Sequence, residues 1–270
     1  MSKKEIRMSN IGKKSVFSVL FAVLYVILYF VLATGINALI HQPLVATVIA
    51  DVIAVSGYFV CKKYDVDGDL AFGCNTEHRG SSFKSICLTV LVLFASFCLV
   101  FLSIQFFSLS FPELVTENLL KRQEAMVSLG TDSFVCILLS SVLAPVCEEC
   151  IFRGIVLPVF SRKFGYVFGI FVSSFVFGLF HGTLLHVIVA PLLGLFCAYA
   201  YYLTGNIVSS ILVHSGYNTL LMILTSMRVT LPVMSHYTAS FVLIIGYLAV
   251  IVMFVVTFMF FDSRVTARTL

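Results

Sequence analysis

Eight long apolar segments, separated by short polar stretches, divide this chain of 270 residues. They lie at residues 15–40, 44–61, 83–109, 133–157, 166–182, 184–204, 207–227 and 238–261. Each is long enough to cross or nearly cross the hydrocarbon core of a bilayer as a helix, which takes about 20 residues. The segments are continuously apolar, without the alternation of a membrane β-barrel. The sequence therefore predicts an all-α, polytopic membrane protein with eight transmembrane helices.

The composition agrees with this assignment. Hydrophobic residues make up 60% of the chain and charged residues only 11%, whereas a soluble domain carries about 25% charged residues. Most of the surface must therefore face lipid. We expect a basic cytoplasmic N-terminus at residues 1–14, a single transmembrane helical domain at 15–261 and a cytoplasmic C-terminal tail at 262–270.

Lysine and arginine cluster at 3–14, 62–84, 162–163 and 264–268. If eight helices alternate in direction, all four clusters fall on one side of the membrane, and the positive-inside rule makes that side the cytoplasm. This predicts a multi-pass protein of the cell membrane with both termini in the cytoplasm. Basic clusters beside apolar segments are topology signals, so no nucleic-acid partner is expected. The mixed-charge stretch 110–132 fits a plain connector slightly better than a short surface helix.

A few ionisable side chains lie inside the apolar segments, where they are costly and are therefore functional candidates. The fourth segment contains Glu148, Glu149 and Arg153, the fifth contains His181, and the seventh contains His214 and Asn218. Almost every other charge lies in a loop or at a segment end.

The spacing suggests different roles for the two glutamates. Glu149 and Arg153 are four residues apart, so they share a helix face and can form an ion pair that offsets the cost of burial. Glu148 points about 100° away on the same helix and has no cation on its face. It is therefore the better candidate for a general base.

The same four-residue spacing relates His214 to Asn218 and Phe177 to His181. We expect His214 and Asn218 to form a hydrogen-bonding pair on one helix face. Acid–base groups together with a histidine–amide pair are what peptide hydrolysis needs, because one set activates water and the other stabilises the oxyanion of the tetrahedral intermediate.

In type and order these residues resemble the three motifs of the CAAX-protease and bacteriocin-processing family, also called the Abi family, whose intramembrane peptidases include the prenyl-protein endopeptidases. The resemblance covers about residues 133–227. The motifs are Glu148-Glu149-x-x-x-Arg153, Phe177-x-x-x-His181 and His214-x-x-x-Asn218.

The resemblance implies an active-site cavity within the membrane and a role for each motif residue. Glu148 would be the catalytic glutamate and His181 its partner in activating water, while His214 and Asn218 would hold the oxyanion. Supporting roles fall to the remaining motif residues, which are Glu149, Arg153 and Phe177.

Two schemes of water activation stay open. Glu148, His181 and His214 have the donor types of a catalytic zinc site that keeps an open position for water. Alternatively, Glu148 and His181 polarise water without a metal. Cys147 and Cys150 have no second cysteine pair to complete a structural zinc site and are interpreted as packing residues.

The resemblance thus implies an intramembrane endopeptidase that cleaves a membrane-associated protein or peptide, in CAAX-type processing, in bacteriocin or pheromone maturation, or in self-immunity. The compact chain favours a bacterial member with a role in peptide maturation or immunity. One rival is a proton-coupled transporter, which would show internal repeats or paired broken helices that this sequence lacks. A second is an inactive membrane scaffold that retains the motifs. The sequence makes no prediction of oligomeric state.

Overall fold

The computed structural model describes residues 3–41, 43–63, 82–127, 137–181, 183–226, 237–238, 240–241 and 244–248. Apart from short turns, these residues are helical, and no strand occurs among them. The predicted all-α class is therefore confirmed for this part of the chain. The helical elements, in order, are α1 (Lys3–Ile40), α2 (Pro43–Lys63), α3 (Ser82–Ser110), α4 (Pro112–Val127), η2 (Leu139–Leu143), α6 (Ala144–Ile151), η3 (Phe152–Val156), α7 (Leu157–Phe164), α8 (Tyr166–Leu179), α9 (Leu184–Thr204) and α10 (Ile207–Ser226).

The side chains are distributed as in a membrane protein. Large apolar groups such as Leu28, Phe94 and Phe175 are more than half exposed, whereas Glu149 and Arg153 are fully buried. Lipid can cover the apolar exterior, and the buried polar groups can satisfy one another inside the bundle. The distribution is the reverse of that in a water-soluble protein.

The described helices support fewer membrane spans than the sequence predicts. Val19–Ile40, Ser85–Ser110 and Leu184–Thr204 are long and apolar enough to cross a membrane. Val45–Gly57, Tyr166–Leu179 and Ile207–Ile223 are shorter apolar helices. The count of eight is thus not confirmed. Most of the predicted eighth span, 238–261, lies outside the described residues.

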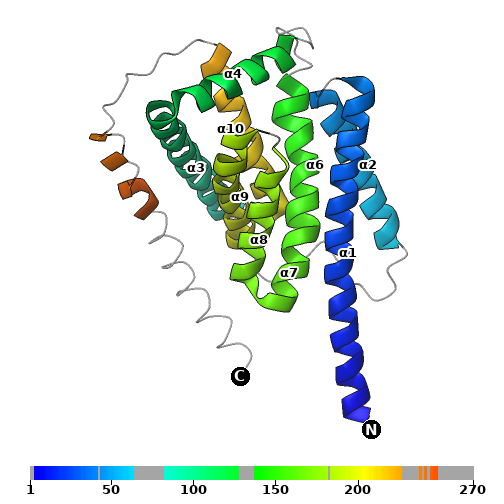
Figure 1. Ribbon diagram of the computed structural model, residues 1–270. Coiled ribbons are helices and arrows are strands. Elements are labelled where there is room, and N and C mark those ends of the chain that lie inside the picture. Colours follow the sequence, from blue (N-terminus) through cyan, green and yellow to red (C-terminus); the bar gives the residue numbers. More distant parts are fainter. Residues whose placement is uncertain are drawn as a thin grey trace.

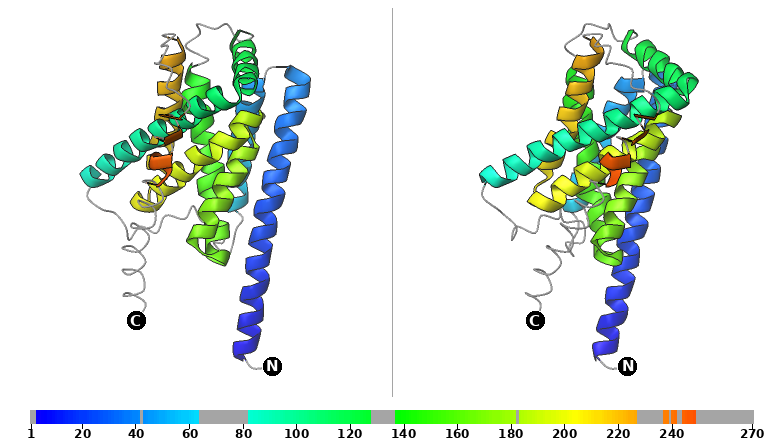
Figure 2. Two further views of the ribbon diagram at one scale, coloured as in Figure 1. Left: turned by 60° about the vertical axis from the view of Figure 1, so that its left-hand side comes forward. Right: turned by 90° about the vertical axis from the view of Figure 1, so that its left-hand side faces the viewer.

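The helices pack as two groups around the α6–α7 helix (Figure 1). On one side α1 and α2 pack against each other, and α2 contacts α6. On the other side α8, α9 and α10 follow one another in contact, and α3 lies obliquely across α9 and α10 (Figure 2). The helix that carries Glu148 and Glu149 is therefore covered from both sides.

Helix α4 lies across one end of the bundle (Figure 1), so the interpretation of residues 110–132 as a plain connector is wrong. Pro112 begins the helix, at a position where its missing N–H costs no hydrogen bond. Glu117 and Lys121, one turn apart, form an exposed ion pair at 2.6 Å. The proline at the first position and the ion pair both stabilise a helix in this stretch, where a loop was expected.

Elements η2, α6, η3 and α7 form one continuous helix in which two π-helical turns flank the glutamates. A proline follows each π-turn: Pro145 after η2 and Pro158 after η3. Proline lacks an N–H, and its ring clashes with the carbonyl four residues earlier in an ordinary α-helix. The wider π-turn relieves that clash. The helix runs to Phe164, beyond the predicted end at residue 157.

Candidate active site

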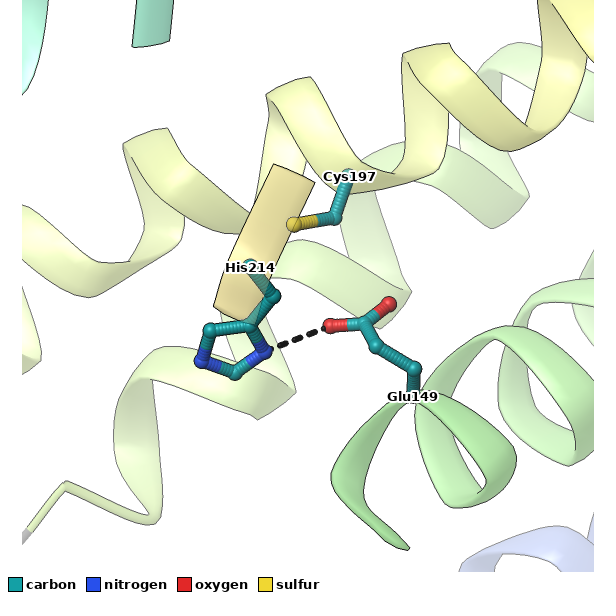
Figure 3. A group of neighbouring side chains, drawn as sticks. All are labelled: Glu149, Cys197 and His214. Atoms are coloured by element: carbon teal, nitrogen blue, oxygen red, sulfur yellow. Dashed lines mark hydrogen bonds and ion pairs between the residues drawn. The ribbon is translucent and has the colours of Figure 1, made fainter. Parts of the chain in front are cut away.

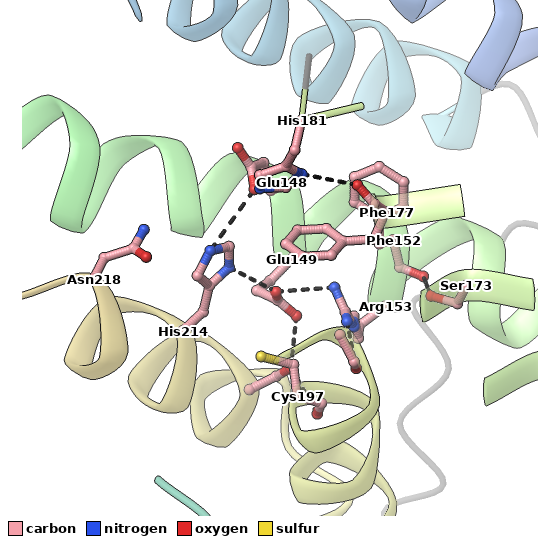
Figure 4. A network of polar contacts seen from close by, with 12 residues as sticks. Glu148, Glu149, Phe152, Arg153, Ser173, Phe177, His181, Cys197, His214 and Asn218 are labelled. Carbon is pink, nitrogen blue, oxygen red and sulfur yellow. Dashed lines mark hydrogen bonds and ion pairs between the residues drawn. The ribbon is translucent and has the colours of Figure 1, made fainter. Parts of the chain in front are cut away.

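Glu149 is the centre of a buried polar network that joins three helices (Figure 4). Its Oε1 accepts hydrogen bonds from Arg153 Nη1 at 3.0 Å and from His214 Nδ1 at 2.9 Å. Its Oε2 lies 2.6 Å from the hydroxyl of Ser210, which also lies 2.8 Å from the carbonyl oxygen of Cys197. Both carboxylate oxygens therefore have partners, which is the condition for burying this charge.

The predicted ion pair between Glu149 and Arg153 is confirmed, with both side chains fully buried. The guanidinium makes two further contacts. Its Nη2 donates to the carbonyl oxygen of Gly194 at 2.6 Å, and it lies over the ring of Phe177 at 4.9 Å. A Cβ at position 194 would lie only 3.2 Å from Nη2. Glycine at this position thus leaves room for both Ser174 of α8 and the guanidinium that donates to its carbonyl oxygen.

His214 receives its orientation from Glu149. A carboxylate can only accept, so the hydrogen on this side belongs to Nδ1 of His214, and Nε2 faces the opposite way. Nε2 lies 3.8 Å from Oε2 of Glu148. That distance is too long for a direct hydrogen bond. His214 therefore bonds to Glu149 through Nδ1 and faces Glu148 with Nε2.

Glu148 differs from Glu149 in exposure and in bonding. Its side chain is 14% exposed, and its Oε2 has no hydrogen-bond partner in the described part of the chain. An oxygen of this carboxylate is therefore available to accept a proton or a hydrogen bond from a bound molecule. The predicted difference between the two glutamates is matched by the geometry, because Arg153 pairs with Glu149 and, among the described residues, makes no hydrogen bond or ion pair with Glu148.

Phe177 and His181 lie beside this pair. The ring of Phe177 is fully buried and contacts His181 edge-on at 4.6 Å and His214 at 5.3 Å between centroids. His181 lies in the turn after α8, and its Nδ1 is 3.0 Å from the carbonyl oxygen of Phe177. Because a carbonyl only accepts, Nδ1 carries the hydrogen and Nε2 is left to accept.

Asn218 does not pair with His214 as expected. Its Nδ2 donates instead to the carbonyl oxygen of Ser140 at 3.0 Å. Ser140 belongs to the π-turn η2, and an irregular turn offers such a carbonyl. The second N–H of the amide is not used by this bond. His214 and Asn218 still project from the same face of α10 (Figure 4).

One group of three side chains in the described part of the chain has the donor types and distances of a metal site. Glu149, Cys197 and His214 have ligand atoms that all lie within 4.8 Å of one another (Figure 3). The hydrogen bonds that these side chains already make do not suit a bound cation, however. Both oxygens of Glu149 already accept hydrogen bonds, and the positive charge of Arg153 lies 3.0 Å away. The predicted zinc ligands Glu148, His181 and His214 do not form a group of this kind.

A second polar cluster ties α4 to the turn that carries His181. The buried Asn118 of α4 donates to Thr183 Oγ1 and lies 3.2 Å from Nδ1 of His186. Thr183 Oγ1 is 2.8 Å from the same nitrogen, and the rings of His181 and His186 are 6.1 Å apart. The resemblance gave His186 no role, and this contact was not foreseen.

We expect Asn118→Ala to loosen α4. Losing one buried hydrogen-bonding side chain costs about 1 kcal/mol, so amide hydrogen exchange in α4 should accelerate about fivefold. Mass spectrometry after deuterium labelling measures this. The control is Thr116→Ala on the exposed face of the same helix, which should leave exchange unchanged. Equal exchange in the two variants would show that the Asn118 cluster does not hold α4 in place.

Two other buried polar residues were missed in the sequence. Ser210 lies four residues before His214 and therefore on the same face as His214 and Asn218, a signal that the spacing contained. Asp51 lies inside the apolar segment 44–61 and is fully buried. The rule that an ionisable residue within the membrane is a functional candidate would have selected it.

The part of the chain that forms this site is also the part that is similar to known proteins. Residues 130–220 match the model of the family described as "Type II CAAX prenyl endopeptidase Rce1-like". This range contains all three sequence motifs. The resemblance to the CAAX-protease and bacteriocin-processing family is therefore confirmed over this segment.

A curated relative is similar over nearly the same length. The protein named "Putative membrane peptidase YdiL" from Bacillus subtilis (strain 168) is 33% identical over 88 residues, which is 33% of this chain and 36% of that protein. The aligned segment thus spans about a third of the relative's length. No solved structure matches the chain. Over this segment the chain is thus similar to proteins described as peptidases.

Proposed function

We propose that this protein is a glutamate-dependent intramembrane endopeptidase whose active site is built from Glu148, His181, His214 and Asn218. The observation that carries the proposal is that Oε2 of Glu148, which has no hydrogen-bond partner in the described residues, lies 3.8 Å from Nε2 of a histidine whose other nitrogen is held by Glu149. Such a pair can take a proton from water on one side and donate a hydrogen bond on the other.

In the proposed reaction, Glu148 accepts a proton from a water molecule that Nε2 of His181 helps to orient. The hydroxide attacks the carbonyl carbon of the scissile peptide bond, and the negative charge develops on the carbonyl oxygen. Protonated His214 donates from Nε2 to that oxygen, and the free N–H of Asn218 is the second donor. Glu148 then passes its proton to the leaving nitrogen as the bond breaks.

Glu149 and Arg153 support this chemistry without touching the substrate. The carboxylate at Nδ1 fixes the orientation of the His214 ring and stabilises the ring when it is positively charged. Arg153 in turn keeps Glu149 ionised and in place. We propose a substrate that is a membrane-associated protein or peptide, because the site lies inside a bundle with a lipid-facing exterior. CAAX-type processing, peptide maturation and self-immunity all belong to this class.

The test uses the purified protein in liposomes with a library of internally quenched peptides, half of them carrying a C-terminal farnesyl-cysteine. Cleavage by the parent protein supports the proposal, and the cleaved members identify the substrate class. If no peptide is cleaved while the protein takes up protons in a Glu148-dependent manner, the function is transport and the proposal is wrong.

Chelation distinguishes the two schemes of water activation. We expect cleavage to persist after dialysis against EDTA and 1,10-phenanthroline, because the occupied Glu149–Cys197–His214 group does not suit a metal. Metal content is measured by mass spectrometry on the same samples. Loss of cleavage on chelation, with recovery on adding zinc, would contradict the metal-free scheme and leave Glu148, His181 and His214 as the candidate ligands.

A further inference from the structure

His181 is held differently from the other residues of the proposed active site. Glu148 lies in α6, and His214 and Asn218 lie in α10, so the backbone hydrogen bonds of a helix fix their positions. His181 instead lies in the short turn between α8 and α9. Side chains on helices are placed more precisely than those on loops. We therefore expect the turn of His181 to be supported by contacts from elsewhere in the fold.

Thr183 supports this turn through both its backbone and its side chain. Its backbone N–H donates to the carbonyl oxygen of His181 at 2.6 Å. Its hydroxyl oxygen lies 2.5 Å from Nδ2 of Asn118 in α4 and 2.8 Å from Nδ1 of His186 in α9. A single residue therefore joins the backbone of His181 to side chains from two different helices.

The direction of these hydrogen bonds follows from the chemistry of the groups. The NH₂ group of Asn118 only donates, so the hydroxyl oxygen of Thr183 accepts. The hydrogen of that hydroxyl is then donated to Nδ1 of His186. Nδ1 also lies 3.2 Å from Nδ2 of Asn118, so the three side chains form a closed cluster. Each member of this cluster limits the movement of the other two.

The cluster is anchored in α4, which lies across one end of the bundle (Figure 1). Asn118 is only 6% exposed. Val115, one turn before it, is equally buried and packs in one apolar cluster with Leu185 and Val189 of α9. If α4 served only to cover the bundle, an apolar residue at position 118 would be sufficient. A buried amide needs a hydrogen-bond partner, and the partner here belongs to the turn of His181.

We propose that Asn118 and Thr183 are positioning residues for His181. Asn118 holds the hydroxyl of Thr183, and the backbone N–H of Thr183 holds the carbonyl oxygen of His181, so that Nε2 of this histidine stays where it orients the water molecule. The inference rests on the proposed function, because it requires His181 to take part in water activation. It gives a role in the reaction to α4, which lies outside the segment that matches the peptidase family.

Thr183→Val and Thr183→Ser are the decisive pair, because valine keeps the branched shape without the hydroxyl and serine keeps the hydroxyl. In Thr183→Val we expect kcat to fall about 10- to 100-fold, the range for a misplaced catalytic group, while KM changes less than about twofold. Thr183→Ser should retain most of the parental kcat. The control is Thr116→Val on the exposed face of α4, where the hydroxyl bonds to the carbonyl oxygen of Pro112. It should leave kcat unchanged.

A variant in α4 tests whether the two residues act along one path. Asn118→Leu removes the donor and fills the position with an apolar side chain, and it should lower kcat about as much as Thr183→Val. The double variant should be no slower than the slower single variant, because both changes break the same connection. Losses of kcat that multiply in the double variant would mean that the two residues act separately, and this would overturn the proposal.

Amide hydrogen exchange of the turn needs no peptide substrate. Mass spectrometry should show exchange about fivefold faster in the peptide that contains His181 and Thr183, the effect of losing one hydrogen bond. This is expected in Asn118→Leu and Thr183→Val and not in Thr116→Val.

A cluster that only fastens α4 to the bundle predicts another pattern. Exchange would then accelerate in α4 alone, and kcat of Thr183→Val would stay at the parental value or fall equally in Thr183→Ser. Any of these results overturns the positioning role. If the parent cleaves no peptide at all, the proposed function fails, whereas exchange in the turn still reports whether Asn118 holds it. The failures of the two proposals are therefore distinguishable.

Discussion

Glu148→Gln is expected to lower the rate of peptide cleavage by about 100- to 10,000-fold, the contribution of a general base, without unfolding the protein. Glutamine has almost the same shape but cannot take a proton from water. Oε2 of Glu148 has no hydrogen-bond partner in the described part of the chain, so the substitution breaks no bond made by that atom. Tm should therefore equal or exceed that of the parent. Cleavage of a library peptide in liposomes and thermal unfolding in detergent measure the two quantities.

The matched control for this prediction is Glu117→Gln, the same chemical change at an exposed position of α4. It should alter neither cleavage nor Tm by a measurable amount, because exposed ion pairs contribute little. Cleavage that survives Glu148→Gln would place the base on another residue and would end the mechanism proposed above.

Glu149→Ala is expected to have the largest effect on stability. Its carboxylate accepts hydrogen bonds from Arg153 and His214, and Ser210 lies within hydrogen-bond distance. Removal leaves the fully buried guanidinium without its counter-charge. Removing one partner of a buried ion pair lowers the free energy of unfolding by about 3–5 kcal/mol. Thermal unfolding in detergent should show a Tm well below that of Glu148→Gln, and cleavage should be lost because His214 has lost its support.

A double variant separates the effect of charge from the effect of packing. Glu149→Gln combined with Arg153→Met removes both charges while keeping similar volumes, so Tm should recover much of the loss. Cleavage should not recover, because glutamine cannot hold a positively charged His214. An unchanged Tm in Glu149→Ala would mean that Arg153 does not depend on this carboxylate.

What the sequence predicted correctly was local. The pairing of Glu149 with Arg153 follows from four-residue spacing on one helix, and the structure contains it. The absence of a cation on the face of Glu148 was read from the same geometry. Spacing of this kind is set by the backbone of one helix, so it needs no knowledge of how helices pack.

The expectation that failed depended on packing between helices. Spacing alone paired His214 with Asn218, but the fold brings α6 against α10 and offers both residues other partners. His214 bonds to Glu149, 65 residues away, and Asn218 bonds to the backbone of Ser140. Contacts between residues so far apart in sequence follow from the packing of whole helices, which spacing within one helix does not report.

Helix α4 and the buried Asp51 were missed for a different reason. The signals were present in the sequence, as Pro112 with the Glu117–Lys121 spacing and as one acid in an apolar segment. For α4, the mixed charges and the proline are compatible with a short helix as well as with a loop. In the second case, the acid lies outside the three motifs, yet Asp51 is fully buried and accepts a hydrogen bond from Tyr29 of α1.

The two π-turns around Glu148 and Glu149 have a consequence for how this helix tolerates change in length. A π-turn holds one residue more than an α-turn, so η2 and η3 each behave as a single-residue insertion. Deleting one residue in either turn restores a regular helix and leaves the parts on both sides facing as they do now, because the wider turn absorbs the extra residue. The glutamates lie between the two turns. The direction in which they point from the helix is therefore independent of the direction of the side chains at either end. Relatives that lack either turn would need a compensating gap at that point of the alignment to keep their glutamates facing the same histidine.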